Sequence, residues 1–411
     1  MRRALLAGAL AFLGILFVGL SLRTVITSIS PLLEVVSAEV HLDGLTLGVI
    51  AAAPTLAYAL SGVITPALAR RLGLEWTVVL VLAVMAAGHI IRAAAWESGL
   101  LLAATVLTLL ASGVGNVLVP PLIKRYFPEQ IGVVTAVYVG SLAVSSALPA
   151  LIAVPVAELI GWRAYLAVWG VAALLASVPW LLEFRVSRRR VAIAEPTVLA
   201  PPAPGGRGSL AGSWIAWSLV GVFAMCSFGG FAMLAWMPTI LVESAGLDPA
   251  LAGSLLSLFA VCGFPVALLI PPLVARVPRL TVPIIVTGMI AFCVGYTGLL
   301  LAPAAAPVLW VLALGVGGLP YPLCFTLIGL RTRSADTALS LSGFVQAVGY
   351  TVAAIGPFAV GLLHELTGTW SVPVGFLLSA VLLALPAVFV LGRPGMMVED
   401  ELDARRARLR S

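Results

Sequence analysis

Long apolar stretches recur along the whole chain, and each is long enough to cross the hydrocarbon core of a bilayer as one helix. Only 10% of the 411 residues are charged, which leaves too little polar surface to cover a water-exposed globule. We therefore predict an all-α membrane protein with twelve transmembrane helices, whose bounds are approximate by a few residues. The predicted spans are 4–30, 45–69, 75–95, 99–123, 131–157, 164–184, 214–241, 249–273, 280–301, 306–330, 336–363 and 371–392.

Basic residues concentrate on one side of these spans. If the N-terminus is cytoplasmic, all but three of the 23 Lys and Arg residues fall on the cytoplasmic side, the exceptions being Arg23, Arg92 and Arg163. This asymmetry predicts two cytoplasmic termini and a multi-pass protein of a bacterial inner membrane. The net charge of +6 is then explained by topology and by contacts with anionic lipid, and we do not expect nucleic-acid binding.

One segment is unlike the rest of the chain. Residues 185–213 contain Arg188-Arg189-Arg190 and the run Pro201-Pro202-Ala203-Pro204-Gly205-Gly206, which cannot pack a core. We interpret 185–213 as a cytoplasmic linker between an N-terminal six-helix half, 1–184, and a C-terminal six-helix half, 214–392. Residues 393–411 form a cytoplasmic tail.

The two halves repeat short patterns at an offset of about 200 residues, as internal duplication requires. The matched pairs are Pro66–Arg71 with Pro271–Arg276, Gly113–Asn116 with Gly315–Gly318, and Pro155 and Gly161-Trp162 with Pro357 and Gly368-Thr369-Trp370. Two parallel six-helix halves joined by a linker are the architecture of the major facilitator superfamily. In that superfamily the substrate site lies at the membrane midplane, and transport proceeds by alternating access.

Four further stretches suggest a particular branch of that superfamily. They are Leu22-Arg23-Thr24-Val25-Ile26-Thr27-Ser28, Gly113-Val114-Gly115-Asn116-Val117-Leu118 with Lys124-Arg125, Gln346-Ala347-Val348-Gly349-Tyr350 with Ala353–Pro357, and Gly361-Leu362-Leu363-His364. With them the chain resembles the cyanate/2-nitroimidazole-type transporters. The resemblance implies a secondary transporter of a small molecule that acts without a cofactor and as a monomer.

The loop after the second predicted span also resembles the superfamily pattern G-x-L-A-D-R-x-G-R-K. Here the sequence is Pro66-Ala67-Leu68-Ala69-Arg70-Arg71-Leu72-Gly73-Leu74-Glu75, with Arg70 in place of the acidic residue. The resemblance implies gating or conformational roles for Arg70, Arg71, Gly73 and Pro357.

Arg23 is the candidate anchor of a substrate site. It lies inside the first span with apolar runs on both sides, and an embedded arginine usually faces a water-filled cavity or a partner. The sequence places no Asp or Glu near mid-depth, so an anionic substrate would supply the counter-charge. A planar guanidinium suits a small linear or planar anion. The alternative is a structural arginine that bonds helix carbonyls.

Other polar residues are candidates for the same site. Gln346 and Tyr350 are four residues apart on one helix face, Tyr138 begins a polar stripe, and Tyr58 lies at mid-depth. Asn116 sits beside glycines that allow close helix approach. We treat these five as candidate substrate-binding residues. For Asn116, and for the pair of Gln346 and Tyr350, the alternative is an interhelix contact.

Three function hypotheses follow. The first is a transporter of a small monovalent anion such as cyanate, and the second is an exporter of neutral nitroheterocycles or other small metabolites. The third, a membrane enzyme or sensor, is disfavoured because the sequence lacks HExxH, nucleophile-elbow, P-loop and metal-cluster motifs. Without an embedded carboxylate, we do not expect proton coupling through a protein acid. His89 is expected near the outer end of the third span, as a surface or hydrogen-bonded histidine.

Overall fold

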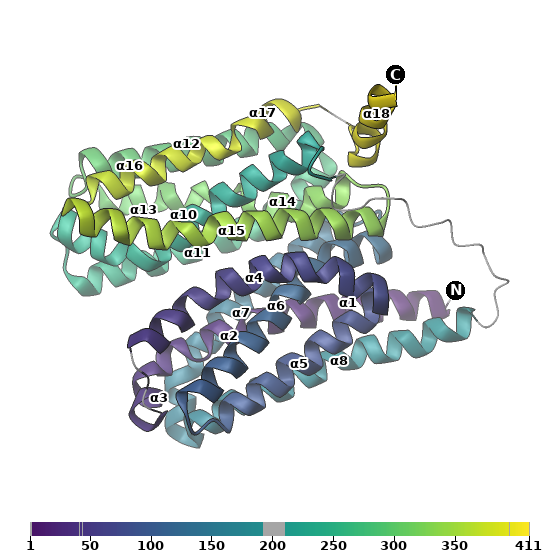
Figure 1. Cartoon of the computed structure of the whole chain (residues 1–411), viewed down its shortest axis with the longest axis horizontal. Coiled ribbons are helices and arrows are strands. Elements are labelled where there is room, and N and C mark those ends of the chain that lie inside the picture. The colour runs from purple at the N-terminus through teal and green to yellow at the C-terminus, as the bar shows by residue number, and fades with distance from the viewer. Residues whose placement is uncertain (1, 41, 43, 192–209, 394, 411) are drawn as a thin grey trace. The chain divides into compact units, whose positions relative to one another are not determined.

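The computed structural model describes residues 2–40, 42, 44–191, 210–393 and 395–410, and these residues form helices without any strand (Figure 1). Within them, eleven helical spans are long and apolar enough to cross a membrane. The remaining predicted span, 45–69, coincides with a helix at Gly44–Leu72. The predicted all-α membrane architecture is therefore confirmed.

The chain divides into two compact units. Unit 1 comprises Met1–Gln130, Val137–Gly205 and Ser334–Gly343, and unit 2 comprises Ile131–Ala136, Gly206–Arg333 and Phe344–Ser411. Residues 131–136, from the N-terminal half of the sequence, thus belong to unit 2, and residues 334–343, from the C-terminal half, belong to unit 1. The predicted linker falls mostly on residues 192–209, which lie outside the described residues.

The N-terminal half contains helices α1 (Arg2–Leu22), α2 (Thr24–Thr27), η1 (Ser30–Leu32), α3 (Leu33–Val40), α4 (Gly44–Leu72), α5 (Leu74–Ala93), α6 (Ser98–Tyr126), α7 (Ile131–Ile160) and α8 (Trp162–Val191). Helix α8 continues into the segment that we predicted as linker. Inside unit 1, α5 packs against both α6 and α8. Gly88 lets α5 approach α6 closely, because a Cβ there would meet the hydroxyl of Thr108.

The C-terminal half contains α10 (Trp214–Ala245), α11 (Pro249–Arg276), η2 (Pro278–Leu280), α12 (Thr281–Leu301), α13 (Pro307–Gly317), α14 (Pro320–Leu330), α15 (Ala335–Thr367), α16 (Ser371–Ser379), η3 (Ala380–Ala384), α17 (Leu385–Val390) and α18 (Val398–Arg410). The predicted span 306–330 is broken between α13 and α14. Pro320 at the start of α14 cannot donate a main-chain hydrogen bond to the preceding turn, which accounts for the break.

The tail is folded rather than extended. Arg331 donates through its guanidinium to the carbonyls of Leu391, Arg393 and Met396, at 2.7, 2.8 and 3.1 Å. Burial lowers the pKa of Arg331 from its ordinary value. In α18, Glu401 accepts hydrogen bonds from the hydroxyl of Ser213 and the main-chain N–H of Trp214, both at 2.6 Å. The tail thus caps the first turn of α10, where an acidic group is favourable.

Candidate functional site

The first membrane span is interrupted at Arg23. Helix α1 ends at Leu22 and α2 begins at Thr24, with Arg23 in a turn between them. Three side-chain hydroxyls bond the main chain there. Ser112 donates to the Leu22 carbonyl at 2.5 Å, Thr24 donates to the Ser21 carbonyl at 2.7 Å, and Ser145 accepts the Arg23 N–H at 3.2 Å. Backbone polar groups at membrane depth need such internal partners, so these hydroxyls make the break possible.

The Arg23 side chain lies over an aromatic ring. Its Cζ atom is 5.2 Å from the centre of the Tyr58 ring of α4, within the range of a cation–π interaction. The Tyr58 hydroxyl is 2.8 Å from Ser112 Oγ. Because the single Ser112 hydroxyl hydrogen goes to Leu22, Tyr58 is the donor in this contact. The ring that faces the guanidinium is therefore fixed by the same serine that bonds the helix break.

Arg23 lies well inside its span and is partly exposed. The apolar span runs from Leu6 to Leu32, and Arg23 keeps accessible surface whereas Tyr58 is buried. A cation at this depth that can still be reached suits recognition of a negatively polarised group.

Asn116 and Tyr138 contact each other. The Tyr138 hydroxyl donates to Asn116 Oδ1, and both side chains are buried. This bond joins α6 to α7. It is the kind of interhelix contact that we gave as the alternative to substrate binding for Asn116.

Gln346 and Tyr350 belong to unit 2 and are both buried on α15. The Tyr350 hydroxyl lies 3.2 Å from that of Tyr321, and the Tyr350 ring packs edge-on against Phe223, with centroids 5.0 Å apart. The predicted binding residues therefore belong to both units, with Arg23, Tyr58, Asn116 and Tyr138 in unit 1 and Gln346 and Tyr350 in unit 2.

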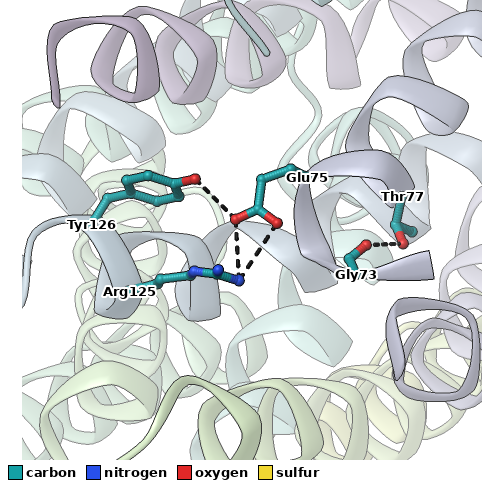
Figure 2. A network of polar contacts seen from close by, with 5 residues as sticks. All are labelled: Gly73, Glu75, Thr77, Arg125 and Tyr126. Atoms are coloured by element: carbon teal, nitrogen blue, oxygen red, sulfur yellow. Dashed lines mark hydrogen bonds and ion pairs between the residues drawn. The ribbon is translucent and has the colours of Figure 1, made fainter. Parts of the chain in front are cut away.

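The predicted gating residues lie at the end of α4, before α5 and inside α15. Arg70 and Arg71 are exposed at the end of α4. Gly73 precedes α5 with a φ of 84°, a conformation that favours glycine, and its carbonyl accepts the Thr77 hydroxyl at 2.6 Å (Figure 2). In unit 2, the Pro357 carbonyl inside α15 accepts the Trp236 indole N–H at 2.8 Å.

An ion pair that we did not predict lies beside Gly73. Glu75, in the first turn of α5, is 3.2 Å from the Arg125 guanidinium and accepts the Tyr126 hydroxyl at 2.9 Å (Figure 2). The sequence held a signal for it, since an acidic residue opens α5 and basic residues close α6. Glu75 thus supplies a carboxylate five positions after Arg70, which occupies the superfamily's usual acidic position.

His89 and Arg92 form a contact that the sequence analysis did not predict. His89 was expected near the outer end of its span as a surface or hydrogen-bonded histidine. It is hydrogen-bonded, and both it and Arg92 are fully buried, with 0% exposure. His89 lies 3.3 Å from the Thr24 hydroxyl, at the first residue after Arg23.

Each unit also has a glutamate whose carboxylate contacts side chains more than 100 positions later in the sequence. In unit 1, Glu39 pairs with Arg163, whose Cζ lies 4.2 Å from the Trp162 ring centre. The hydrogen bond from Arg163 lowers the Glu39 pKa below its ordinary value of 4.5. In unit 2, Glu243 accepts the Trp370 indole N–H at 2.8 Å and lies 3.6 Å from His364.

The described part of the chain contains no group of three His, Cys, Asp or Glu side chains that could hold a metal ion. The four cysteines are free thiols.

Comparisons with known proteins agree with this architecture. The chain is 32% identical over 401 residues to the uncharacterized transporter YycB of Bacillus subtilis, covering 96% of each chain. It is 33% identical to the 2-nitroimidazole transporter of Escherichia coli, covering 90% of this chain and 93% of that one. It is 25% identical to the cyanate transport protein CynX of Escherichia coli, covering 87% and 90%.

The solved structure of the human organic anion transporter MFSD10 superimposes with a TM-score of 0.68 at 16% identity, covering 94% of this chain and 99% of that chain. At this identity the likeness concerns the fold alone. The model of the Major Facilitator Superfamily matches residues 11–354. The chain is therefore a member of the major facilitator superfamily, a transporter of small solutes and not an enzyme.

Proposed function

We propose that this transporter carries a small monovalent anion, cyanate or one of similar shape, and that Arg23 is the anchor of its binding site. The observation that carries the proposal is the position of the Arg23 guanidinium, partly exposed at a helix break inside a membrane span and set over the Tyr58 ring. A planar cation held in this way can make two parallel hydrogen bonds to a small anion.

The surroundings of Arg23 support this role. Its main-chain N–H is held by Ser145, and the preceding carbonyl is held by Ser112. A binding group whose backbone is fixed in advance loses less entropy when ligand arrives. The relative named as a cyanate transport protein supports the anionic class.

A second candidate is export of neutral nitroheterocycles, favoured by the relative named as a 2-nitroimidazole transporter. In that case the Arg23 guanidinium would bind a nitro oxygen. For either substrate we propose a monomer that works by alternating access in a bacterial inner membrane, with both termini cytoplasmic.

The test is thermal stabilisation of the purified full-length protein by potassium cyanate and, separately, by 2-nitroimidazole. Wild type, Arg23→Lys and Arg23→Ala are compared, because a ligand that binds the folded state raises its apparent stability. Stabilisation by cyanate that is weakened in Arg23→Lys and lost in Arg23→Ala supports the anion carrier. Stabilisation by 2-nitroimidazole alone would replace it with the exporter. Cyanate stabilisation that persists in Arg23→Ala would remove Arg23 from the site.

A further inference from the structure

His89 and Arg92 form a buried polar cluster in unit 1 that the transport proposal has not used. They lie one turn apart on α5, and neither exposes any surface. Side chains as polar as these are rarely buried without a function at membrane depth.

The hydrogen bonds around His89 have one consistent direction. The Thr24 hydroxyl has a single hydrogen, which it donates to the Ser21 carbonyl at 2.7 Å. Its oxygen can therefore only accept from His89 Nε2, which lies 3.3 Å away. The hydrogen of the neutral imidazole is then on Nε2, and Nδ1 is left as an acceptor that faces Arg92 Nη1 at 3.5 Å.

The same contacts disfavour a second proton on the ring. A hydrogen on Nδ1 would point at the Arg92 guanidinium, a like charge in a buried place. Among the described residues, no carboxylate forms an ion pair or hydrogen bond with His89 or Arg92 that would offset this repulsion.

The helices packed against α5 bring no compensating charge. Helix α6 presents Thr108 to Gly88, and its acidic cap Glu97 is exposed. Helix α8 presents Gly170 to Ile90. Arg163 at its start is paired with Glu39, and its buried Glu183 interacts with Tyr126, the last residue of α6. Helix α4 also packs against α5, and its charged residues Arg70 and Arg71 are exposed at its C-terminal end. The nearest charge recorded at His89 is therefore the positive one of Arg92.

We infer that His89 is a positioning residue for Arg23, a neutral Nε2–H donor oriented by Arg92 that fixes Thr24 and with it the helix break. The chain of bonds runs from Arg92 through His89 and Thr24 to the Ser21 carbonyl. This inference rests on the proposed function for the role of Arg23. It also assigns His89 no part in carrying protons, although a lone buried histidine in a transporter would otherwise suggest one.

The first experiment needs no substrate. The chain has three histidines, so a His41→Gln, His364→Gln variant leaves His89 alone, and ¹⁵N-histidine labelling then reports one ring by solid-state NMR in lipid bilayers. We expect a protonated Nε2, an unprotonated Nδ1, and no second protonation between about pH 5 and pH 8, the range in which an ordinary histidine titrates. A hydrogen on Nδ1, or a doubly protonated ring in this range, would overturn the inference.

Two variants in that single-histidine background test the partners. Thr24→Val removes the acceptor while keeping the side-chain shape, and should shift the Nε2 signal. Arg92→Met removes the guanidinium at similar length, and should let His89 take up a second proton as the pH falls. A ring that behaves as in the parent in both variants would refute the assigned chain of bonds.

The second experiment measures cyanate affinity by thermal stabilisation. The substitution His89→Gln places an amide N–H near the position of Nε2, whereas the side chain introduced by His89→Asn is too short to reach it, so the two variants form a matched pair. We expect His89→Gln to keep affinity within about threefold at every pH and His89→Asn to lose about tenfold, the worth of one buried hydrogen bond. Equal losses in both variants would overturn the positioning role.

The NMR and affinity experiments distinguish failure of the His89 inference from failure of the proposed function. If cyanate does not stabilise wild type while the NMR result is as expected, the proposed substrate is wrong and the structural role of His89 stands. If cyanate binding is normal and the NMR shows a titrating ring, the transport proposal stands and His89 is a proton site. Size-exclusion profiles that match wild type establish that each variant is folded.

Discussion

Ser112 donates its hydroxyl hydrogen to the carbonyl of Leu22 at 2.5 Å, across 90 positions of sequence, at the last residue before the helix break. The Tyr58 hydroxyl donates in turn to Ser112 at 2.8 Å. One serine of α6 therefore satisfies the end of α1 and orients the ring that faces Arg23.

Replacing Ser112 with Ala should destabilise unit 1. The Leu22 carbonyl and the Tyr58 hydroxyl would both lose their partner in a buried place, and leaving such groups unsatisfied costs about 1–3 kcal/mol. The measurement is the unfolding transition of purified protein. Ser146→Ala, which removes only a bond to the Leu142 carbonyl of its own helix, is the control and should have a smaller effect. Equal effects would contradict the role of Ser112.

Tyr58 should act on Arg23 through its ring face and not through its hydroxyl. Tyr58→Phe keeps the face and should keep cyanate affinity nearly unchanged, whereas Tyr58→Leu should weaken it by the worth of a cation–π contact, about 0.5–2 kcal/mol. Both affinities are measured by titrating thermal stabilisation. Comparable loss of affinity in the Phe variant would show that the hydroxyl is required too, either through its bond to Ser112 or through a bond to substrate.

The pair of Glu75 and Arg125 should contribute little to stability. Its side chains are 14% and 52% exposed, and partly exposed ion pairs contribute about 0–1 kcal/mol after solvent screening. A double-mutant cycle with Glu75→Gln and Arg125→Gln should give a coupling energy below about 1 kcal/mol that decreases with added salt. A larger, salt-insensitive coupling would indicate a buried role for the pair.

Acid should remove the contribution of Glu39. Its folded pKa lies below the ordinary 4.5, so the stabilisation is present above that ordinary value and is lost as the pH falls through the folded pKa. The difference in melting temperature between wild type and Glu39→Gln should therefore be present at about pH 7 and vanish under strongly acidic conditions. A difference that is constant with pH would show that the carboxylate charge is not responsible.

Hydropathy alone predicted the all-α membrane fold, because a bilayer imposes long apolar segments whose length can be read directly from the chain. Arg23 was identified as a candidate because a charged side chain inside an apolar span is costly in lipid and usually faces a partner or a water-filled cavity. The prediction failed to find the break at Arg23, because the break depends on Ser112 and Ser145, which are 90 and 122 positions away from their partners. The sequence around a serine in an apolar helix does not indicate which distant carbonyl its hydroxyl will bond.

The burial of His89 could not be predicted for a similar reason. Position along a span indicates depth in the membrane, and it does not indicate whether a side chain faces lipid, water or another helix. Gly88 and Thr108 place α5 close against α6, and His89 follows directly on the buried face. The contacts of Glu75 could not be predicted because its partners, Arg125 and Tyr126, lie 50 and 51 positions away in the sequence.

We propose above that Arg23 holds a small anion during transport. The most direct test of this proposal is the initial rate of uptake of ¹⁴C-cyanate into proteoliposomes containing wild type, Arg23→Lys or Arg23→Ala at matched protein density. We predict saturable uptake by wild type, a rate reduced by up to about tenfold in Arg23→Lys because a point charge cannot replace the planar fork, and background uptake in Arg23→Ala. Saturable uptake by Arg23→Ala at the wild-type rate would contradict the proposal.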